Sequence, residues 1–212
     1  RVIFMKKMKK IMTISAVLLS MATAVGAETM NFYDVPEGAW FYQYVETAFN
    51  DGILNGKREN YFEPNSNMTL GEAAKIAASI HASQMGLEEE FQPTGEKWYD
   101  TYVDYCRLNG IIEATIGFDW DKDATRAEMA YIFSRCDTVP YFINNVPFTD
   151  IPDVTEEMDF ANEIQDLYNK GIVRGNSENY DFYPDSYIKR SEVAAIVARI
   201  LDSSMRIELP KG

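Results

Sequence analysis

The stretch from Trp40 to Gly52 reads WFYQYVETAFNDG, and the stretch from Trp98 to Gly110 reads WYDTYVDYCRLNG. In both, tryptophan and glycine lie twelve positions apart, and the pair Tyr-Val occupies the fifth and sixth positions. The segment 159–171 (DFANEIQDLYNKG) has the same length, with Asp159 in the tryptophan position. Three copies of one pattern indicate an internal repeat, and this repeat decides how the rest of the chain is interpreted.

Further landmarks follow each copy in the same order. Each glycine is followed by an apolar pair, and further on a phenylalanine stands ten residues before a glutamate. These pairs are Phe62 with Glu72, Phe118 with Glu128, and Phe182 with Glu192. The first and third copies also open alike, with FYDV at 32–35 and FTDI at 148–151. The period is about 55 to 65 residues, which is typical of a structural repeat.

Each copy is predicted to form a helix, a loop and a second helix. The apolar residues of 40–49 fall on one helical face, and Gly52 is expected to end that helix in the left-handed conformation. The second helix begins with a capping box, as in Thr69-x-x-Glu72 and Thr125-x-x-Glu128. We therefore expect an almost entirely helical mature chain, with helices near 38–51, 70–82, 97–109, 126–136, 157–170 and 189–202.

The repeats divide the chain into segments. Repeats are expected at 28–82, 98–136 and 148–202, polar linkers at 83–97 and 137–147, and a C-terminal tail at 203–212. One helix pair buries too little apolar surface to be stable alone, so the three repeats are predicted to pack as one all-α unit.

Residues 1–27 are predicted to be a secretory signal peptide. Four lysines within 6–10 precede an apolar run at 11–21, and small residues lead to a cleavage site after Ala27, with Ala24 as a second candidate. A membrane anchor is the alternative, but the run is shorter than the ~20 residues of a spanning helix. Cleavage would remove five basic residues and no acidic ones, changing the net charge from −13 to −18.

Composition excludes several classes of function. The chain of 212 residues has 33 acidic and 20 basic residues, and a surface this acidic repels nucleic acid. One histidine and two cysteines leave no cluster of soft metal ligands and no disulfide scaffold. We therefore expect neither a metal nor a cofactor.

The combination F-x-D-V, W, G-I, F-x-P and T-R-A-E resembles the S-layer homology (SLH) domain of bacterial surface proteins. The resemblance covers about residues 31–201. It implies three repeats in a pseudo-threefold assembly, with ligand grooves between them. It also implies noncovalent attachment to cell-wall polymers, often pyruvylated secondary polysaccharides. In this family the arginine of T-R-A-E helps to bind the acidic sugar, together with the tryptophan and the loop glycines.

The family motif is unevenly kept. The second repeat keeps Thr125-Arg126-Ala127-Glu128 together with its Trp98. The third keeps the arginine, as Arg190, but loses both the N-cap hydroxyl and the tryptophan. The first has Leu70 in that position, so its groove needs Lys57 or Arg58 as a substitute. We expect one or two competent sites. The polysaccharide-binding residues that the resemblance implies are Arg126, Arg190, Trp98, Trp40, Thr125, Gly175 and Gly56.

Each candidate has a simpler interpretation. Arg126 and Arg190 lie in the first turn of a helix, where a cation is unfavourable unless an external anion meets both the guanidinium and free backbone N–H groups. Otherwise they are solvated surface arginines. The tryptophans could stack on sugars or belong to the core. The three glutamates that begin the second helices are helix caps rather than catalytic acids.

Three other features suggest no ligand site. Asp119-x-Asp121-x-Asp123 begins like a calcium loop but lacks the glycine and glutamate that complete one. Cys106 and Cys136 are expected to be free and buried, with a disulfide as the alternative. His81 is expected at the surface at the end of a helix.

Two functions remain open. The first is noncovalent anchoring at the bacterial cell surface by binding an acidic wall polysaccharide. The alternative is a structural protein of the envelope whose degenerate repeats assemble with other envelope proteins and bind little polysaccharide. A glycosidase is a weak third class, because the repeats use nearly all of the chain. No enzymatic activity is expected, and Arg126 is expected to contribute more to binding than any other residue.

Overall fold

A computed structural model describes residues 29–87, 91–139, 141–176 and 179–209, and the predicted signal peptide lies outside these ranges. The described part is all-α and without strands, as predicted. Its helices are α1 (Tyr42–Asn50), α2 (Leu70–Gln84), α3 (Asp100–Leu108), α4 (Arg126–Cys136), α5 (Ala161–Asn169) and α6 (Arg190–Leu201), with 3-10 turns at Phe148–Asp150 and Ser203–Met205.

The second helix of each repeat lies close to its predicted bounds, whereas the first helix is shorter than predicted. α1, α3 and α5 have nine residues each and begin three or four residues later than expected. Phe160, just before α5, has a φ of 62°, so no helix can run through it. The expectation of an almost entirely helical chain was therefore wrong, because long loops connect these short helices.

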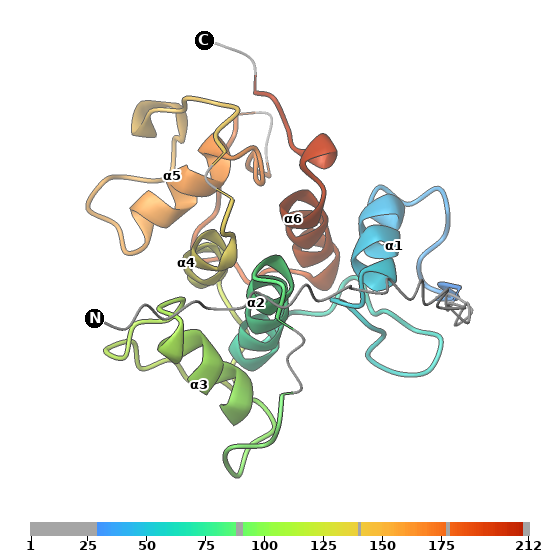
Figure 1. Cartoon of the computed structure of the whole chain (residues 1–212). Coiled ribbons are helices and arrows are strands. Elements are labelled where there is room, and N and C mark those ends of the chain that lie inside the picture. Colours follow the sequence, from blue (N-terminus) through green and yellow to red (C-terminus); the bar gives the residue numbers. More distant parts are fainter. Residues whose placement is uncertain (1–28, 88–90, 140, 177–178, 210–212) are drawn as a thin grey trace, which may run out of the picture.

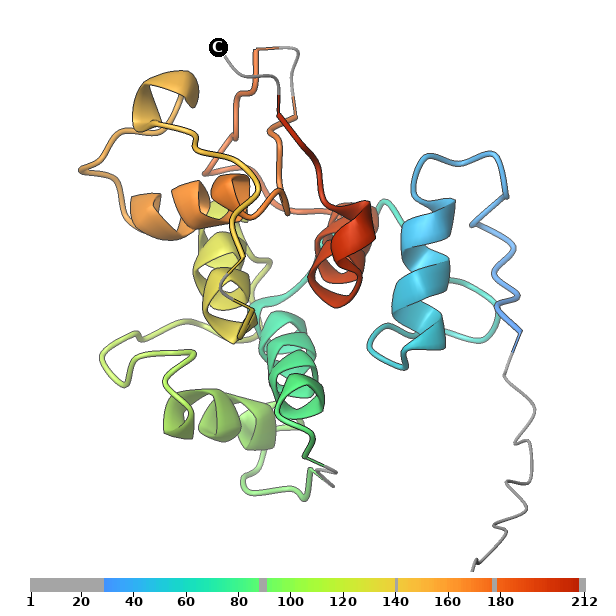
Figure 2. The ribbon, with the colours of Figure 1, turned by 45° about the horizontal axis from the view of Figure 1, so that its top comes forward.

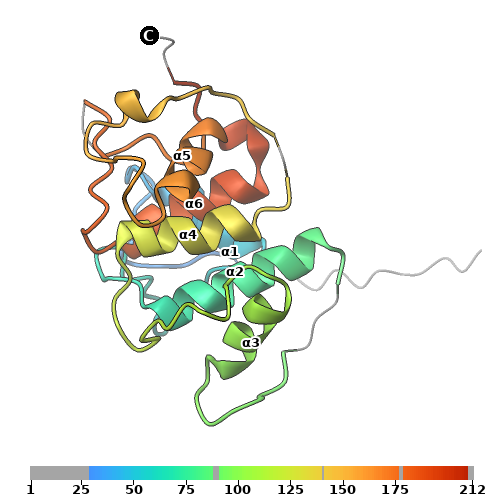
Figure 3. The ribbon, with the colours of Figure 1, turned by 90° about the vertical axis from the view of Figure 1, so that its left-hand side faces the viewer.

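The two helices of one repeat do not pair with each other. α1 packs against α6, α3 against α2, and α5 against α4, while α2 and α4 also contact each other. Each short helix thus packs on the second helix of a neighbouring repeat. Figure 1 shows the result, with α1, α3 and α5 at three separate corners around α2, α4 and α6. Figure 2 shows α1 beside α6, and Figure 3 shows α3 beside α2.

A ring of three backbone hydrogen bonds marks the centre of the pseudo-threefold arrangement. Its members are Met68, Ala124 and Ile188, each one residue before the N-cap of a second helix and each buried. The N–H of Ala124 donates to Met68 O (2.8 Å), that of Met68 to Ile188 O (3.2 Å), and that of Ile188 to Ala124 O (3.2 Å). The segments that lead into α2, α4 and α6 therefore meet in equivalent positions around one axis.

Two aspartates fix the loops that precede the second helices. The Asp34 carboxylate accepts hydrogen bonds from the N–H groups of Phe62 (2.9 Å) and Glu63 (2.7 Å). Asp153 accepts in the same way from Phe182 (2.7 Å) and Tyr183 (2.6 Å). Asp34 therefore corresponds to Asp153. The sequence alignment of FYDV with 148–151 was wrong by three residues.

The predicted C-terminal tail is part of the fold as far as it is described. Arg206 is buried, and the N–H of Ile207 donates to Gly171 O at 2.8 Å. The N–H of Leu209 donates to the Asn144 side chain at 2.9 Å. Among the described helices, none is long and apolar enough to cross a membrane.

Candidate functional site: the groove between α1 and α6

A groove of about 840 Å³ opens between α1, α6 and the loop that follows α5. Its lining includes Trp40 from the first repeat, Arg126 from the second, and Gly175 from the third. Three of the seven predicted site residues thus meet in one cavity, to which all three repeats contribute. Sequence reasoning had instead grouped Arg126 with Trp98 because both belong to the second repeat.

The charge of this groove differs from that of the whole protein. Its charged lining residues are three arginines (Arg126, Arg174 and Arg199) and one carboxylate, Glu192. The whole chain carries a net charge of −13. A concave surface with an excess of cations concentrates anions locally, even on an acidic protein.

Arg126 is buried rather than solvated. Its Nε donates to Phe182 O (2.6 Å), its Nη1 to Glu192 Oε1 (2.8 Å), and its guanidinium carbon lies 4.8 Å from the centre of the Phe182 ring. Burial lowers the pKa of Arg126 and the Glu192 carboxylate opposes this shift, but an arginine remains charged at neutral pH. Arg126 therefore joins the second and third repeats, and its side chain forms the inner wall of the groove.

The helix N-termini are not open to an external anion as expected. The N–H of Arg126 donates to Ser186 O (2.9 Å), and the N–H of Ala127 to Pro184 O (3.0 Å). The corresponding groups at the starts of α2 and α6 also donate to carbonyls of a neighbouring repeat. Loops of adjacent repeats therefore satisfy these donors, which are not available to a ligand in the groove.

Arg199 and Tyr44 form the side of the groove between α6 and α1. The guanidinium carbon of Arg199 lies 4.8 Å from the Tyr44 ring centre, and its Nη2 donates to the Tyr44 hydroxyl at 3.1 Å. Its Nη1 donates to Ile172 O at 2.9 Å. Its Nε is a buried donor without a partner within the described part of the chain. Arg199 and Tyr44 thus hold each other in place, and both line the groove.

Trp40 and Trp98 belong to the surface rather than to the core. Trp40 is 61% exposed and Trp98 is 54% exposed. Each ring makes edge contacts with the next residue and with the tyrosine four positions on, at closely similar distances. The two tryptophans are therefore equivalent in local geometry. They differ in position, because Trp40 lines the groove with Arg126, whereas Trp98 is not among the residues that line it.

The two predicted loop glycines have different surroundings. Gly175 has a φ of +79°, and a Cβ there would lie 2.5 Å from the Tyr180 carbonyl. A Cβ at Gly56 would meet the Phe32 ring at 2.8 Å. Both glycines are required by close packing of their loops. Gly175 also lines the groove, beside the exposed residues Arg174 and Asn176.

Arg190 binds backbone carbonyls in the loop of the first repeat. Its Nε donates to Phe62 O (2.9 Å) and its Nη2 to Asn55 O (2.8 Å). Lys57 binds the Glu72 carboxylate at 2.7 Å, and Arg58 pairs with Glu63, so both predicted substitutes have partners. The arginines of the second and third repeats thus each reach the loop of the next repeat, the third repeat being followed by the first. By the same relation, Leu70 affects the loop of the second repeat rather than that of the first.

Aromatic residues occupy the region that corresponds to the groove in the second repeat. Leu70 is buried in the arginine position. Phe118 packs against Tyr131 and Phe160, with ring centres 6.0 and 6.2 Å away. Because Leu70 and Asp159 occupy the arginine and tryptophan positions, this region holds no counterpart of Arg126 or Trp40 among the described residues.

Thr125 acts as a helix cap. Its Oγ1 accepts a hydrogen bond from the Glu128 N–H at 3.2 Å, and Glu128 Oε2 accepts one from the Thr125 N–H at 2.8 Å. The predicted capping box is therefore present, as is the one at Thr69. Glu192 keeps only the carboxylate half, accepting from the Lys189 N–H at 2.9 Å.

The remaining candidates have structural partners. Cys106 and Cys136 are free and buried. His81 lies inside α2, partly buried, with its Nδ1 3.0 Å from the Tyr105 hydroxyl, and so differs from the predicted surface residue. The aspartates of 119–123 bind Lys122, Lys97, Tyr99 and Asn67. No group of three metal-ligating side chains is present among the described residues.

Sequence reasoning missed several lining residues, among them five with polar side chains: Tyr44, Arg174, Asn176, Tyr180 and Arg199. Arg174 and Asn176 flank Gly175, which was a candidate, so the loop itself contained the signal. Arg199 and Tyr44 lie on helices of different repeats. Their proximity depends on the packing of α1 against α6, which no pattern within one repeat reveals.

The described residues form an all-α protein of three lobes with a cationic groove, and this is the class that the fold and the site define. Two segments of this chain, residues 31–74 and 147–194, match the family model of the S-layer homology domain. The middle helix pair lies between these segments and is placed equivalently by the structure.

Curated relatives include surface-layer proteins. The chain is 23% identical to the S-layer protein sap of Bacillus anthracis over 191 residues, covering 87% of this chain and 23% of that protein. It is 29% identical to the surface-layer 125 kDa protein of Lysinibacillus sphaericus over 154 residues, covering 68% and 13%. The exoglucanase XynX of Acetivibrio thermocellus is 26% identical over 183 residues, covering 84% and 17%. The chain thus spans less than a quarter of each of these relatives.

Proposed function

We propose that this protein is a noncovalent anchor of the bacterial cell surface that binds an acidic cell-wall polysaccharide in the groove between α1 and α6. The observation that carries the proposal is the groove itself, where three arginines and an exposed tryptophan line one cavity of an otherwise acidic protein. An anionic sugar offers a carboxylate to the arginines and an apolar ring face to the indole.

The middle helix pair is inferred to be a third, divergent repeat behind a secretory signal at residues 1–27. Its place in the ring of Met68, Ala124 and Ile188 supports this inference. The region of the middle repeat that corresponds to the groove holds the buried Leu70 and an aromatic cluster. We infer that this region supports the fold rather than binding a ligand. The first and third repeats then supply most of the site, with Arg126 as the contribution of the second.

The range of relatives fits an anchoring role. The segment that this chain matches occurs in surface-layer proteins and in a protein named as an exoglucanase. A module shared by proteins with such different names is more consistent with attachment than with one catalytic activity. We propose that this chain has no enzymatic activity of its own, and that its glutamates are helix caps and ion-pair partners.

The test is sedimentation of residues 28–212 with peptidoglycan sacculi of Lysinibacillus sphaericus. One sample keeps its wall polysaccharide, a second is treated with mild acid to remove ketal-linked pyruvate, and a third is stripped of polysaccharide with hydrofluoric acid. We expect binding to the first sample, weaker binding to the second and none to the third. Equal binding to all three would contradict polysaccharide recognition.

The alternative function is assembly with other envelope proteins. It predicts that the protein fails to bind intact sacculi but is retained by a surface-layer protein extract from the same cells. The three sacculus samples and the extract therefore separate the two functions in one experiment.

A further inference from the structure

We propose that residues 203–209 form a strap that closes one wall of the groove, with Arg206 as the positioning residue that holds the strap in place. The proposal deepens the proposed function and rests on it. The strap lies outside both segments that match the family model, 31–74 and 147–194. It also lies outside the predicted repeats and was expected to be a tail.

Ile207 is the residue through which the strap reaches the site. It lines the groove together with Trp40, Arg126 and Arg199. Its N–H donates to Gly171 O at 2.8 Å, and its carbonyl accepts from Asn144 Nδ2 at 2.9 Å. A Cβ at Gly171 would lie 2.7 Å from the Ile207 carbonyl oxygen, so the strap lies directly on this glycine. Ile207 is thereby fixed as an apolar wall beside the cationic groups.

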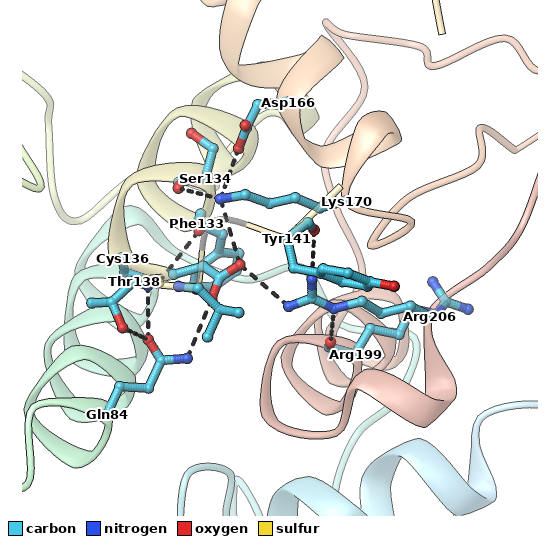
Figure 4. Close-up of polar contacts among 12 residues, drawn as sticks. Gln84, Phe133, Ser134, Cys136, Thr138, Tyr141, Asp166, Lys170, Arg199 and Arg206 are labelled. Carbon is cyan, nitrogen blue, oxygen red and sulfur yellow. Dashed lines mark hydrogen bonds and ion pairs between the residues drawn. The ribbon is translucent and has the colours of Figure 1, made fainter. Parts of the chain in front are cut away.

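Arg206 attaches the strap to three parts of the fold at once. Its Nε donates to Arg199 O on α6 (3.1 Å), and its Nη1 donates to Tyr141 O in the second linker (3.1 Å). Its Nη2 pairs with Asp137 Oδ2 at 3.4 Å, and the two side chains are 1% and 0% exposed. Figure 4 shows Arg206 pointing between Tyr141 and Arg199. One contact thus ends on the backbone of Arg199, a residue of the groove itself.

Lys170 completes the buried charge cluster. Its Nζ lies 3.5 Å from Asp137 Oδ2 and 3.0 Å from Asp166 Oδ2, at the end of α5. Figure 4 shows Lys170 between Ser134 and Asp166. Because Lys170 also pairs with Asp137, loss of Arg206 leaves that carboxylate with a partner. A variant at Arg206 therefore releases the strap without leaving the Asp137 carboxylate as an isolated buried charge. Such a charge would lower the stability of the fold far more than loss of the strap contacts.

The experiment compares Arg206→Met, Arg206→Lys and Ile207→Ala with the wild-type protein. Ile112→Val is the matched control, because Ile112 is buried and does not belong to the groove lining. Amide hydrogen exchange is measured without ligand. In Arg206→Met we expect exchange at Ile207 and Leu209 to be roughly tenfold faster, with the middle of α4 unchanged. Arg206→Lys should recover part of the protection, since an ammonium cannot reach all three acceptors.

The same proteins are then sedimented with intact Lysinibacillus sphaericus sacculi. We expect Arg206→Met and Ile207→Ala to bind about tenfold more weakly than wild type, and Ile112→Val to bind normally. Ile207→Ala keeps the contacts of Arg206, so it tests the apolar wall of the groove even if Arg206→Met does not fold. Unchanged exchange in Arg206→Met, or normal binding by Ile207→Ala, would overturn the proposal. If wild type binds no sacculi, the proposed function fails instead, and the exchange result alone decides whether Arg206 holds the strap.

Discussion

Arg126 at the start of α4 pairs with Glu192 in the first turn of α6, with 2.8 Å between Nη1 and Oε1. Glu192 Oε1 also accepts from Asn176 Nδ2 at 2.7 Å, so the same carboxylate joins α6 to the loop that lines the groove. One ion pair thus connects the second and third repeats and sets the inner surface of the candidate site. Arg126 is therefore a structural residue as well as a candidate binding residue.

Replacing Arg126 with alanine should destabilise the fold. The side chain is 6% exposed and its partner Glu192 is 21% exposed, so the variant leaves a partly buried carboxylate and the Phe182 carbonyl without this donor. We expect the free energy of unfolding to fall by about 2–4 kcal/mol, measured by urea denaturation. Arg126→Lys should lower the free energy of unfolding by less. An Arg126→Ala protein as stable as wild type would contradict this role.

This double role changes how binding data at Arg126 must be interpreted. A loss of binding in Arg126→Ala combines the lost cation with a disturbed groove. Arg174 is exposed and lines the same groove, so Arg174→Ala removes a cation with little expected effect on stability. We expect Arg174→Ala to weaken binding to sacculi several-fold, and more at low than at high salt, because exposed charges are screened.

His81 should make stability depend on pH. Burial lowers the pKa of His81 below its ordinary value of 6.5. The unfolded chain therefore takes up a proton at a higher pH than the folded protein. The buried, neutral His81 therefore contributes to stability above pH 6.5. This contribution is lost as the pH falls from 6.5 through the pKa of His81 in the folded protein. We expect the Tm to decrease over this range, and the decrease to be smaller in His81→Gln.

The single histidine of the chain makes this prediction directly measurable. Its imidazole proton signals in an NMR titration belong to one residue. We expect a midpoint below 6.5 in the folded protein. A midpoint above 6.5 would contradict the burial of His81 against Tyr105.

Both cysteines should be unreactive in the folded protein. Burial raises the pKa of Cys106 to about 12 and that of Cys136 well above its ordinary value. The thiolate is the reactive form, so labelling by a disulfide reagent at pH 8 should be slow. After unfolding in guanidinium chloride, both thiols should react rapidly. Fast labelling of the folded protein, or fewer than two reactive thiols after unfolding, would contradict free buried cysteines.

The sequence predicted local structure well because local structure depends on neighbouring residues. The capping boxes at Thr69 and Thr125 fixed the starts of α2 and α4, and the glycines after the first helices have positive φ as expected. The lengths of α1, α3 and α5 were overestimated. The residues just before these helices continue the helical spacing of apolar side chains, but they form turns.

The site depended on contacts between repeats, which a repeat pattern cannot supply. The repeat pattern grouped Arg126 with Trp98, because both belong to the second repeat. In the structure α1 packs on α6, and this brings Trp40 to Arg126 instead. The strap was missed for a similar reason. Arg206 is an unremarkable cation in sequence, and only the fold reveals that Asp137 and two backbone carbonyls surround it.

The most direct test of the polysaccharide site compares Trp40→Ala with Trp98→Ala. The two indoles have similar exposure and similar aromatic contacts, so truncation should affect stability equally. Only Trp40 lines the cationic groove. The measurement is the Kd of each variant for intact Lysinibacillus sphaericus sacculi. We expect a loss of about 2 kcal/mol, about thirtyfold, for Trp40→Ala and little change for Trp98→Ala. Equal losses, or a larger loss for Trp98→Ala, would contradict a polysaccharide site in this groove.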